Sequence, residues 1–272
     1  MNPEQPVLKA TSQWRLAGSD FIDGLKAHRV WMMLARMDIR QRYRRSVLGP
    51  FWITLTMVIF ILGIGPLYGR LLGIGSDEFI PYLAMGIITW GLISGVILDG
   101  ANAFVGAENL VRAVKLPHSV HIFRVLQRNL IIFLHNLLAF LPFMIYLRIW
   151  PEWRWLLAAP GVLIILLAAL PISFLLGTLS ARFRDLQQII ASVMQLAFFV
   201  TPIFWKAELL KDRAYFAEYN PFQVLLEVVR GPIVDGVPTV HTYLKAGLLI
   251  MILYAVAAPF FIRYRRRLAF WV

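Results

Sequence analysis

Long apolar segments alternate along the chain with shorter charged ones. Six of the apolar segments have the length that a helix needs to cross a hydrocarbon layer of about 30 Å at about 1.5 Å per residue, the fifth only just. They span residues 51–72, 79–98, 129–149, 155–180, 189–205 and 244–262. The ten-residue alternation of a membrane β-barrel is not seen. The pattern therefore predicts an all-α integral membrane protein with six transmembrane helices.

The first fifty residues have a different pattern. Residues 1 to about 20 are polar and aperiodic, which indicates a loose tail, and the first apolar block starts too late for a cleavable signal peptide. From Phe21 to Tyr43 apolar and basic side chains are mixed, as in a helix that lies in the headgroup layer. We therefore divide the chain into a tail with an interfacial amphipathic helix, 1–50, and a six-span transmembrane domain, 51–272.

The fifth apolar segment carries polar side chains at helical spacing. Gln188, Ser192, Gln195 and Phe199 recur at intervals of four, three and four residues, so one helix face holds all four. A polar stripe within hydrocarbon is costly unless it faces protein or water. We therefore predict that the stripe lines a transport pathway. The alternative is that Ser192 and Gln195 hydrogen-bond a neighbouring helix.

Two segments outside the spans have helical patterns of their own. On one side of the membrane, about 107–117, a helix start at Glu108 and a stop at Pro117 predict a short helix that is exposed to a partner. On the other side, residues 206–243 form the longest loop, and their mixture of apolar and charged side chains predicts amphipathic or re-entrant helices.

Composition and charge agree with a membrane protein. The 272 residues are 59% hydrophobic and 15% charged, with a net charge of +12, and their mean hydropathy is +0.68. Nineteen of the 27 basic residues lie on the side of the predicted spans that holds both termini, whereas the 15 acidic residues divide seven to eight. The positive-inside rule then makes both termini cytoplasmic. Topology and anionic headgroups explain the charge without a nucleic-acid partner.

Motifs for catalysis are missing from the sequence. There is no cysteine, and no phosphate-binding loop, zinc-protease or serine-hydrolase motif. His118 and His121 have no third ligand nearby, so no metal site is predicted. Asp99 and Glu108 follow the second span and are expected to be solvated. We therefore predict no catalytic residue in this chain.

Four segments, in order along the chain, resemble the permease subunits of ABC transporters that export polysaccharides and polyol phosphates, the ABC type 2 group. The matching segments are DIRQRYRRSVLGPFW at 38–52, NLVRAVKLP at 109–117, the segment 183–205 with its aromatic-Arg-Asp start, and NPFQVLLEVVR at 220–230. One departure is His118-Ser119 after Pro117, where members often have Arg-Glu.

The resemblance implies a half-transporter of the inner (cytoplasmic) membrane. Two copies of the chain would form the pore, and two copies of a separate cytoplasmic ATPase, which binds ATP and magnesium, would drive it, so this chain needs no cofactor and is not an enzyme. The implied cargo is a lipid-linked polysaccharide, such as O-antigen, a capsular polymer or teichoic acid. Besides its own second copy, the ATPase and the glycan, the expected partners are membrane lipids.

The same resemblance and the chemistry of such a cargo predict the site residues. A lipid pyrophosphate needs cations, for which the candidates are Arg40, Arg42, Arg44 and Arg45, unless these residues merely anchor the topology. Aromatic and amide side chains would bind a sliding sugar chain weakly, unless the rings serve for packing. The predicted channel residues are Tyr68, Trp90, Ser192, Gln195, Phe198 and Phe199. The predicted ATPase contacts are Glu108, Asn109, Arg112, Lys115 and Pro117, and the predicted outer gate contains Trp205, Asn220, Pro221 and Arg230.

Other functions are also compatible with the sequence. The nearest is an ABC type 2 permease for a small hydrophobic drug or lipid. An ATP-independent transporter would need acidic residues within its spans, and a membrane acyltransferase would need an intramembrane histidine, for which His135 is the candidate.

Overall fold

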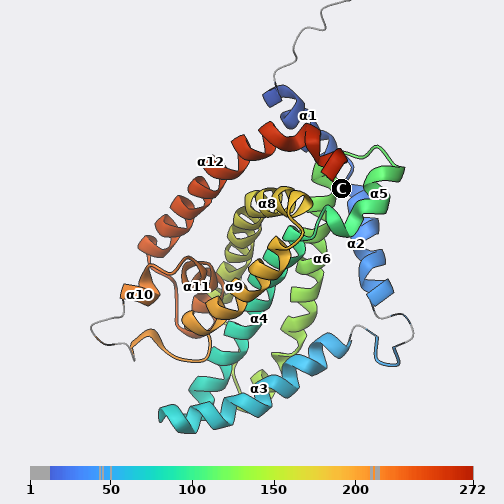
Figure 1. Cartoon of the computed structure of the whole chain (residues 1–272). Helices are drawn as coiled ribbons and strands as arrows, with labels where there is room; N and C mark the ends of the chain where they lie inside the picture. Colours follow the sequence, from blue (N-terminus) through green and yellow to red (C-terminus); the bar gives the residue numbers. More distant parts are fainter. Residues whose placement is uncertain are drawn as a thin grey trace, which may run out of the picture.

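The computed structural model describes residues 13–42, 44, 46–49, 51–208, 211 and 215–271, and all regular structure within these residues is helical (Figure 1). The helices are α1 (Gln13–Lys26), α2 (His28–Arg42), α3 (Phe51–Leu72), α4 (Ser76–Ala101), η1 (Val105–Ala107), α5 (Glu108–Ala113), α6 (His118–Leu138), α7 (Leu141–Leu147), η2 (Trp153–Leu157), α8 (Ala158–Arg182), α9 (Leu186–Val200), α10 (Tyr215–Glu218), α11 (Pro221–Val234) and α12 (Val240–Trp271). The predicted all-α membrane class is confirmed.

Five helical segments in the described part of the chain are long and apolar enough to cross a membrane. They are Phe51–Leu72, Ser76–Ala101, His118–Leu147, Trp153–Arg182 and Val240–Leu268, and they match five of the six predicted spans, with 129–149 predicted to end two residues too late. The remaining predicted span, 189–205, the fifth in chain order, is a 15-residue helix, α9, followed by a bent segment. At about 1.5 Å per residue α9 alone is shorter than the hydrocarbon layer. A count of six spans, with 189–205 among them, stays a prediction.

Pro202 explains why α9 ends where it does. A proline pushes the preceding residue out of the helical conformation, and Thr201 is extended, with φ −86° and ψ 136°. The next residues, 201–205, therefore form an irregular segment at the end of α9. The sequence prediction counted them as helix because they are apolar.

Helix α4 is the centre of the bundle. It packs against α3, α6, α8, α9 and α11, and most of its apolar stretch is buried (Figure 1). Small residues let α8 come close to it, since a Cβ on Gly177 would stand 2.9 Å from the carbonyl oxygen of Gly100. Close approach at small residues is the usual way in which transmembrane helices pack.

Two helices, α1 and α2, precede the first span, where one interfacial helix was predicted. Helix α1 begins at Gln13, so the prediction of a loose tail up to residue 20 is wrong for residues 13–20. The missed interaction is the docking of α1 on α6 and α12. We call the end of the bundle that holds α1, α5 and the last turns of α12 the terminal end.

Asp20 fixes α1 at the start of α6. Its carboxylate accepts hydrogen bonds from the backbone N–H groups of His118 and Ser119, both at 3.0 Å, and pairs with Arg265 of α12 at 3.2 Å. Burial alone would raise the pKa of Asp20, but the hydrogen bond and charge of His118 and the two N–H groups lower it to about 2. Asp20 is therefore a buried, ionised cap for α6.

Replacing Asp20 with asparagine is expected to loosen α1. The lost charge leaves Arg265 and His118 without their carboxylate, so amide hydrogen exchange in α1 should increase severalfold. The matched control is Asp23→Asn, an exposed position on the same helix. Because the folded pKa lies below the ordinary 3.8, the contribution of Asp20 is complete above about pH 4 and is lost as the pH falls towards 2. Equal exchange in both variants would contradict the anchoring role.

Candidate functional site

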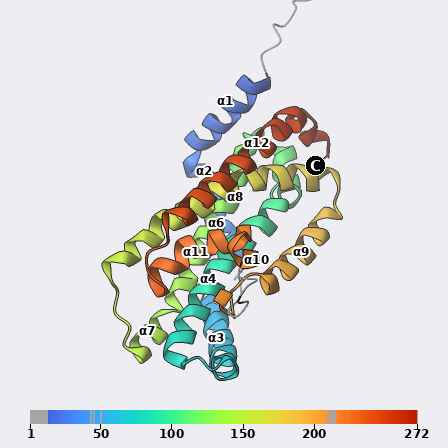
Figure 2. The same ribbon diagram turned by 90° about the vertical axis from the view of Figure 1, so that its left-hand side faces the viewer.

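The polar stripe of α9 lies on the surface of the subunit. Gln188, Ser192, Gln195 and Phe199 are all exposed, while Ile190 and Met194 on the opposite face are buried. Figure 2 shows α9 at one edge of the molecule, with its outer face turned away from the other helices. Within the described residues the stripe is therefore available to a second subunit or to a substrate.

Phe199 contacts the rings of Phe198 and Phe204, but no contact among the described residues of the subunit explains the polar members of the stripe. The Ser192 hydroxyl donates to the carbonyl of Gln188 in its own helix at 3.1 Å. In the described part of the chain, neither Ser192 nor Gln195 hydrogen-bonds another helix. The alternative that they bind a neighbouring helix of the same subunit is thus not what this structure shows.

Aromatic rings connect α9 to the rest of the bundle. Trp90 of α4 is buried, with ring centroids 5.8 Å from Phe198 and 5.6 Å from Phe222. Phe204 lies 5.6 Å from Phe198 and 5.6 Å from Tyr68 of α3. Of the predicted channel aromatics, Phe199 is exposed, Tyr68 and Phe198 are half-buried, and Trp90 is covered. A substrate would reach Trp90 only if the covering rings moved.

The irregular segment 201–205 is held by a buried arginine. Arg230 of α11 is 2% exposed, and its Nη1 donates to the carbonyl oxygen of Pro202 at 2.6 Å. Its guanidinium lies 4.0 Å from the ring centroid of Tyr82, and the Tyr82 hydroxyl lies 3.1 Å and 3.0 Å from the carbonyl oxygens of Pro202 and Trp205. Because the helix is broken, these backbone carbonyl groups have no N–H partner in the next turn. Arg230 and Tyr82 supply the hydrogen-bond donors instead.

Two carboxylates balance the charge of Arg230. Glu227 accepts from its Nη2 at 3.1 Å, and Asp235 lies 3.7 Å from its Nε. Burial raises the pKa of Asp235, and the guanidinium only partly opposes this. Glu227 is therefore the stronger ionic partner of the two.

The other predicted gate residues lie around the same segment. The Trp205 indole donates to the carbonyl of Phe199 at 3.2 Å. Asn220 caps α11 by accepting from the N–H of Phe222 at 2.9 Å and donates to the Thr201 hydroxyl at 3.1 Å, with Pro221 as the first residue of the helix. The structure thus brings the four predicted gate residues together. Tyr82 belongs to the same cluster and was missed.

At the terminal end, α5 projects from the bundle as a short exposed helix (Figure 1). Asn109, Arg112 and Lys115 are exposed, and Pro117 is the N-cap of α6. Glu108 pairs with Arg112 at 2.9 Å and with Arg184 at 3.3 Å. Because Arg184 lies two residues before α9, its ion pair with Glu108 joins α5 to the start of α9. Asn102, the C-cap of α4, accepts from Gln187 at 3.1 Å and joins α4 to the same turn of α9.

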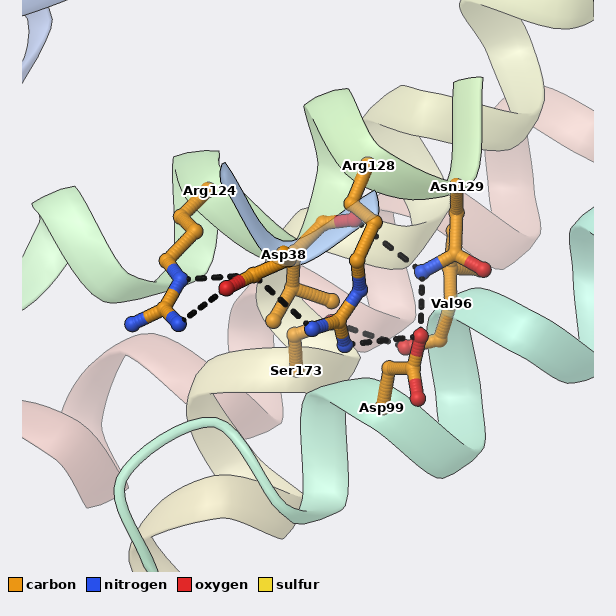
Figure 3. Close-up of polar contacts among 8 residues, drawn as sticks. Asp38, Val96, Asp99, Arg124, Arg128, Asn129 and Ser173 are labelled. Atoms are coloured by element: carbon orange, nitrogen blue, oxygen red, sulfur yellow. Dashed lines mark hydrogen bonds and ion pairs between the residues drawn. The ribbon is translucent and has the colours of Figure 1, made fainter. Parts of the chain in front are cut away.

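A network of charges joins α2, α4 and α6 near this end (Figure 3). Arg124 makes two bonds with Asp38, one of them from Nε at 2.7 Å. Arg128 contacts both Asp38, at 3.0 Å, and Asp99, at 2.8 Å, and Asn129 donates to Asp99 at 2.8 Å. Asp99, which was expected to be solvated, is 35% exposed but also has two partners on α6 that the sequence did not predict.

The network fixes the helix that carries the predicted headgroup cations. Arg40 and Arg42 are exposed at the end of α2, Arg44 is exposed just beyond it, and Arg45 lies outside the described residues. Asp38 faces α6, two residues before Arg40, so its ion pairs hold the end of α2 against the bundle.

The family model for ABC-2 type transporters matches residues 29–234, more than half of the chain. The chain belongs to the ABC-2 type transporter family. It is similar to the O-antigen export system permease protein RfbA of Myxococcus xanthus, with 28% identity over 204 residues that cover 71% of this chain and 75% of the relative. Two RfbA proteins of Klebsiella pneumoniae match at 20% identity over 208 residues, covering 76% of this chain and 80% of theirs, and at 19% over 207 residues, covering 75% and 80%.

Membership confirms the resemblance inferred from the four sequence segments. The matched region includes α2, α5, α9 and α11, which carry the stripe, the gate cluster and the short exposed helix. Permeases of this family normally pair with a separate ATPase subunit, and this chain is such a multi-pass membrane permease.

Replacing Arg230 of this permease with methionine is expected to release the segment 201–205. Arg230 is buried and Glu227 is 25% exposed, so the variant leaves Glu227 and the Pro202 carbonyl with only Gln223 and Tyr82 as partners. The cost should be somewhat below the roughly 3–5 kcal/mol of breaking a fully buried ion pair. Thermal unfolding in detergent should shift to lower temperature, and vesicles that contain the variant should leak ions.

The matched control for Arg230 is Lys245→Met. Lys245 pairs with Glu218 at 2.6 Å, but that carboxylate is 63% exposed. Water replaces an exposed partner easily, so this variant should unfold and conduct like the unaltered permease. If the two variants unfold at the same temperature and leak ions equally, Arg230 does not specifically hold the segment 201–205.

Proposed function

We propose that the chain is the channel-forming permease of an ATP-driven exporter that moves a lipid-linked polysaccharide across the cytoplasmic membrane. The observation that carries the proposal is the exposed stripe of α9, in a chain of this family whose relatives are named as O-antigen export permeases. The stripe combines amide, hydroxyl and aromatic groups, which suit repeated weak contacts with sugar rings.

Two copies of the chain would enclose the pathway. A polar stripe is costly against lipid, so in the membrane it must face water or protein. We place the exposed faces of two α9 helices on opposite sides of one channel, with Phe199 beside the gate cluster. Gln195 and Ser192 then lie further along the same channel, and Gln188 lies where the channel opens at the terminal end.

The terminal end would face the cytoplasm and two copies of the ATPase. Its basic residues favour this orientation by the positive-inside rule. Asn109, Arg112 and Lys115 present an exposed polar surface on α5, and Pro117 keeps that helix separate from α6. Movement of α5 would pull on α9 through the Glu108–Arg184 pair. The ATPase would bind ATP and magnesium, and this chain would bind no cofactor.

The arginines near the end of α2 would receive the lipid pyrophosphate. Arg40, Arg42 and Arg44 are exposed together at the start of the transmembrane domain. One guanidinium group can donate two parallel hydrogen bonds to two oxygens of a phosphate, which suits a dianionic headgroup. Arg45, outside the described residues, is proposed as a fourth member from its position in the sequence.

Replacing Gln195 or Phe199 with alanine is expected to lower glycan export severalfold, because the cargo loses weak contacts in the channel. Surface glycan is measured in cells that lack the native permease, and the dimer and its ATPase are measured by co-purification. The control is Met251→Ala, an exposed apolar position on α12. Normal export by both stripe variants, or loss of the dimer, would overturn the assignment of these residues to the channel.

Replacing Glu108 with arginine is expected to uncouple ATP hydrolysis from export. An exposed ion pair contributes only about 0–1 kcal/mol to stability, so the protein should fold normally while exporting less glycan per ATP. The double variant Glu108→Arg with Arg184→Glu should recover part of the export. The control Glu152→Gln breaks an exposed pair with Arg154 elsewhere in the chain. Failure of the double variant to recover would show that α5 does not act through Arg184.

A small hydrophobic drug or lipid is the second candidate cargo. The observation in its favour is that Ile189, Val193, Leu196 and Val200 are exposed beside the polar stripe. Vesicle transport assays with the permease and its ATPase separate the two cargoes. ATP-dependent uptake of a lipid-linked glycan supports the proposed function, and uptake of a hydrophobic dye alone supports the alternative.

A further inference from the structure

A cavity of about 230 Å³ lies between α1, α8 and α12. Its lining includes Phe21 of α1, Phe174 of α8, and Tyr254, Ala257 and Phe261 of α12. Asp20 also borders it, but the carboxylate is already bonded to α6 and to Arg265. The free surface of the cavity is thus apolar, and its ligand must be apolar where it enters.

The cavity follows the direction of the transmembrane helices. Along α12 it extends from Tyr254 to Ile262, which is about 12 Å of helix at about 1.5 Å per residue. On α8 it reaches Leu170, near the middle of the 25-residue helix. An extended hydrocarbon chain that enters from the terminal end would fit this shape.

The α1 wall of the cavity adjoins an exposed apolar face of the same helix. Trp14 is 62%, Phe21 37% and Leu25 53% exposed, and their spacing of seven and four residues places them on one face. Ala17 and Phe21 on this side of α1 also line the cavity. An apolar face of this kind is stable when it lies in the outer acyl layer of a membrane. The α1 side of the cavity is therefore expected to face lipid tails rather than water.

The turn of α12 that follows the cavity carries basic side chains. Arg266 comes four residues after the lining residue Ile262, so it lies one turn further along the same side of the helix. Arg266 is exposed, and in the described part of the chain it has no carboxylate partner. Arg267 is also exposed but points to another side of the helix.

We propose that this cavity holds one acyl chain of an anionic phospholipid, whose phosphate pairs with Arg266. An acyl chain fills the apolar volume, and the negative headgroup matches the cation at the end of the same helix. The lipid would then bridge α1 to α8 and α12. The site is separate from the α9 stripe, so it does not depend on which cargo the permease exports.

Native mass spectrometry of the purified full-length permease tests the proposal. The protein is exchanged into phosphatidylglycerol, phosphatidylethanolamine with the same acyl chains, or a polyprenyl phosphate. We expect one retained phosphatidylglycerol per chain, in preference to phosphatidylethanolamine. Arg266→Gln should reduce this preference about fivefold, as expected for one basic residue near an anionic lipid. Arg267→Gln is the matched control and should retain the preference.

A second pair of variants tests the cavity itself. Ala258→Phe fills the lining and should abolish lipid retention, whereas Ala255→Phe, at an exposed position on the same helix, should not. If Ala258→Phe fails to fold, the comparison of Arg266→Gln with Arg267→Gln still tests the proposal. Equal retention of both phospholipids, equal effects within either pair of variants, or preferred retention of polyprenyl phosphate would overturn the proposal.

Discussion

A helix that is broken within an apolar bundle must find protein partners for its backbone, because hydrocarbon offers none. This constraint organises the region around residues 201–205. Pro202 ends α9, and the carbonyl groups beyond it turn to donors from other helices. Arg230 and Tyr82 provide these donors, and the buried guanidinium is in turn balanced by Glu227. A break in one helix thus explains an arginine that is 2% exposed.

The terminal end is held together by charges rather than by apolar contacts alone. Asp20 joins α1 to α6 and α12, and Asp38 joins α2 to α6. In each case the carboxylate belongs to a helix before the first span, and its partners belong to the spans. Ionic pairs of this kind are directional, so they fix the position of helices whose apolar faces could otherwise slide. The surface formed by α2, α5 and the start of α9 is therefore well defined.

The two ends are linked by one short helix. Helix α9 begins next to Arg184, which contacts α5, and ends at the segment that Arg230 holds. Its buried face packs on α4 and α8, while its polar face remains free. A displacement at the exposed α5 would thus reach the irregular segment through a single rigid element. In the proposed export mechanism, α9 would thus transmit a movement from the ATPase contact at α5 to the gate cluster.

The sequence by itself determined the membrane class, five spans and the family, because apolar length and motif order are local properties of the chain. It also placed Gln188, Ser192, Gln195 and Phe199 on one helix face, which the structure shows to be exposed. The tertiary structure decided what depends on distant partners. Trp90 and Phe199 look alike in sequence, yet one is buried under Phe198 and Phe222 while the other is exposed. Asp99 was expected to be solvated and Asp20 to lie in a loose tail, but Arg128 of α6 pairs with Asp99 and Arg265 of α12 pairs with Asp20. Periodicity reports which residues share a face, but only packing determines what that face meets.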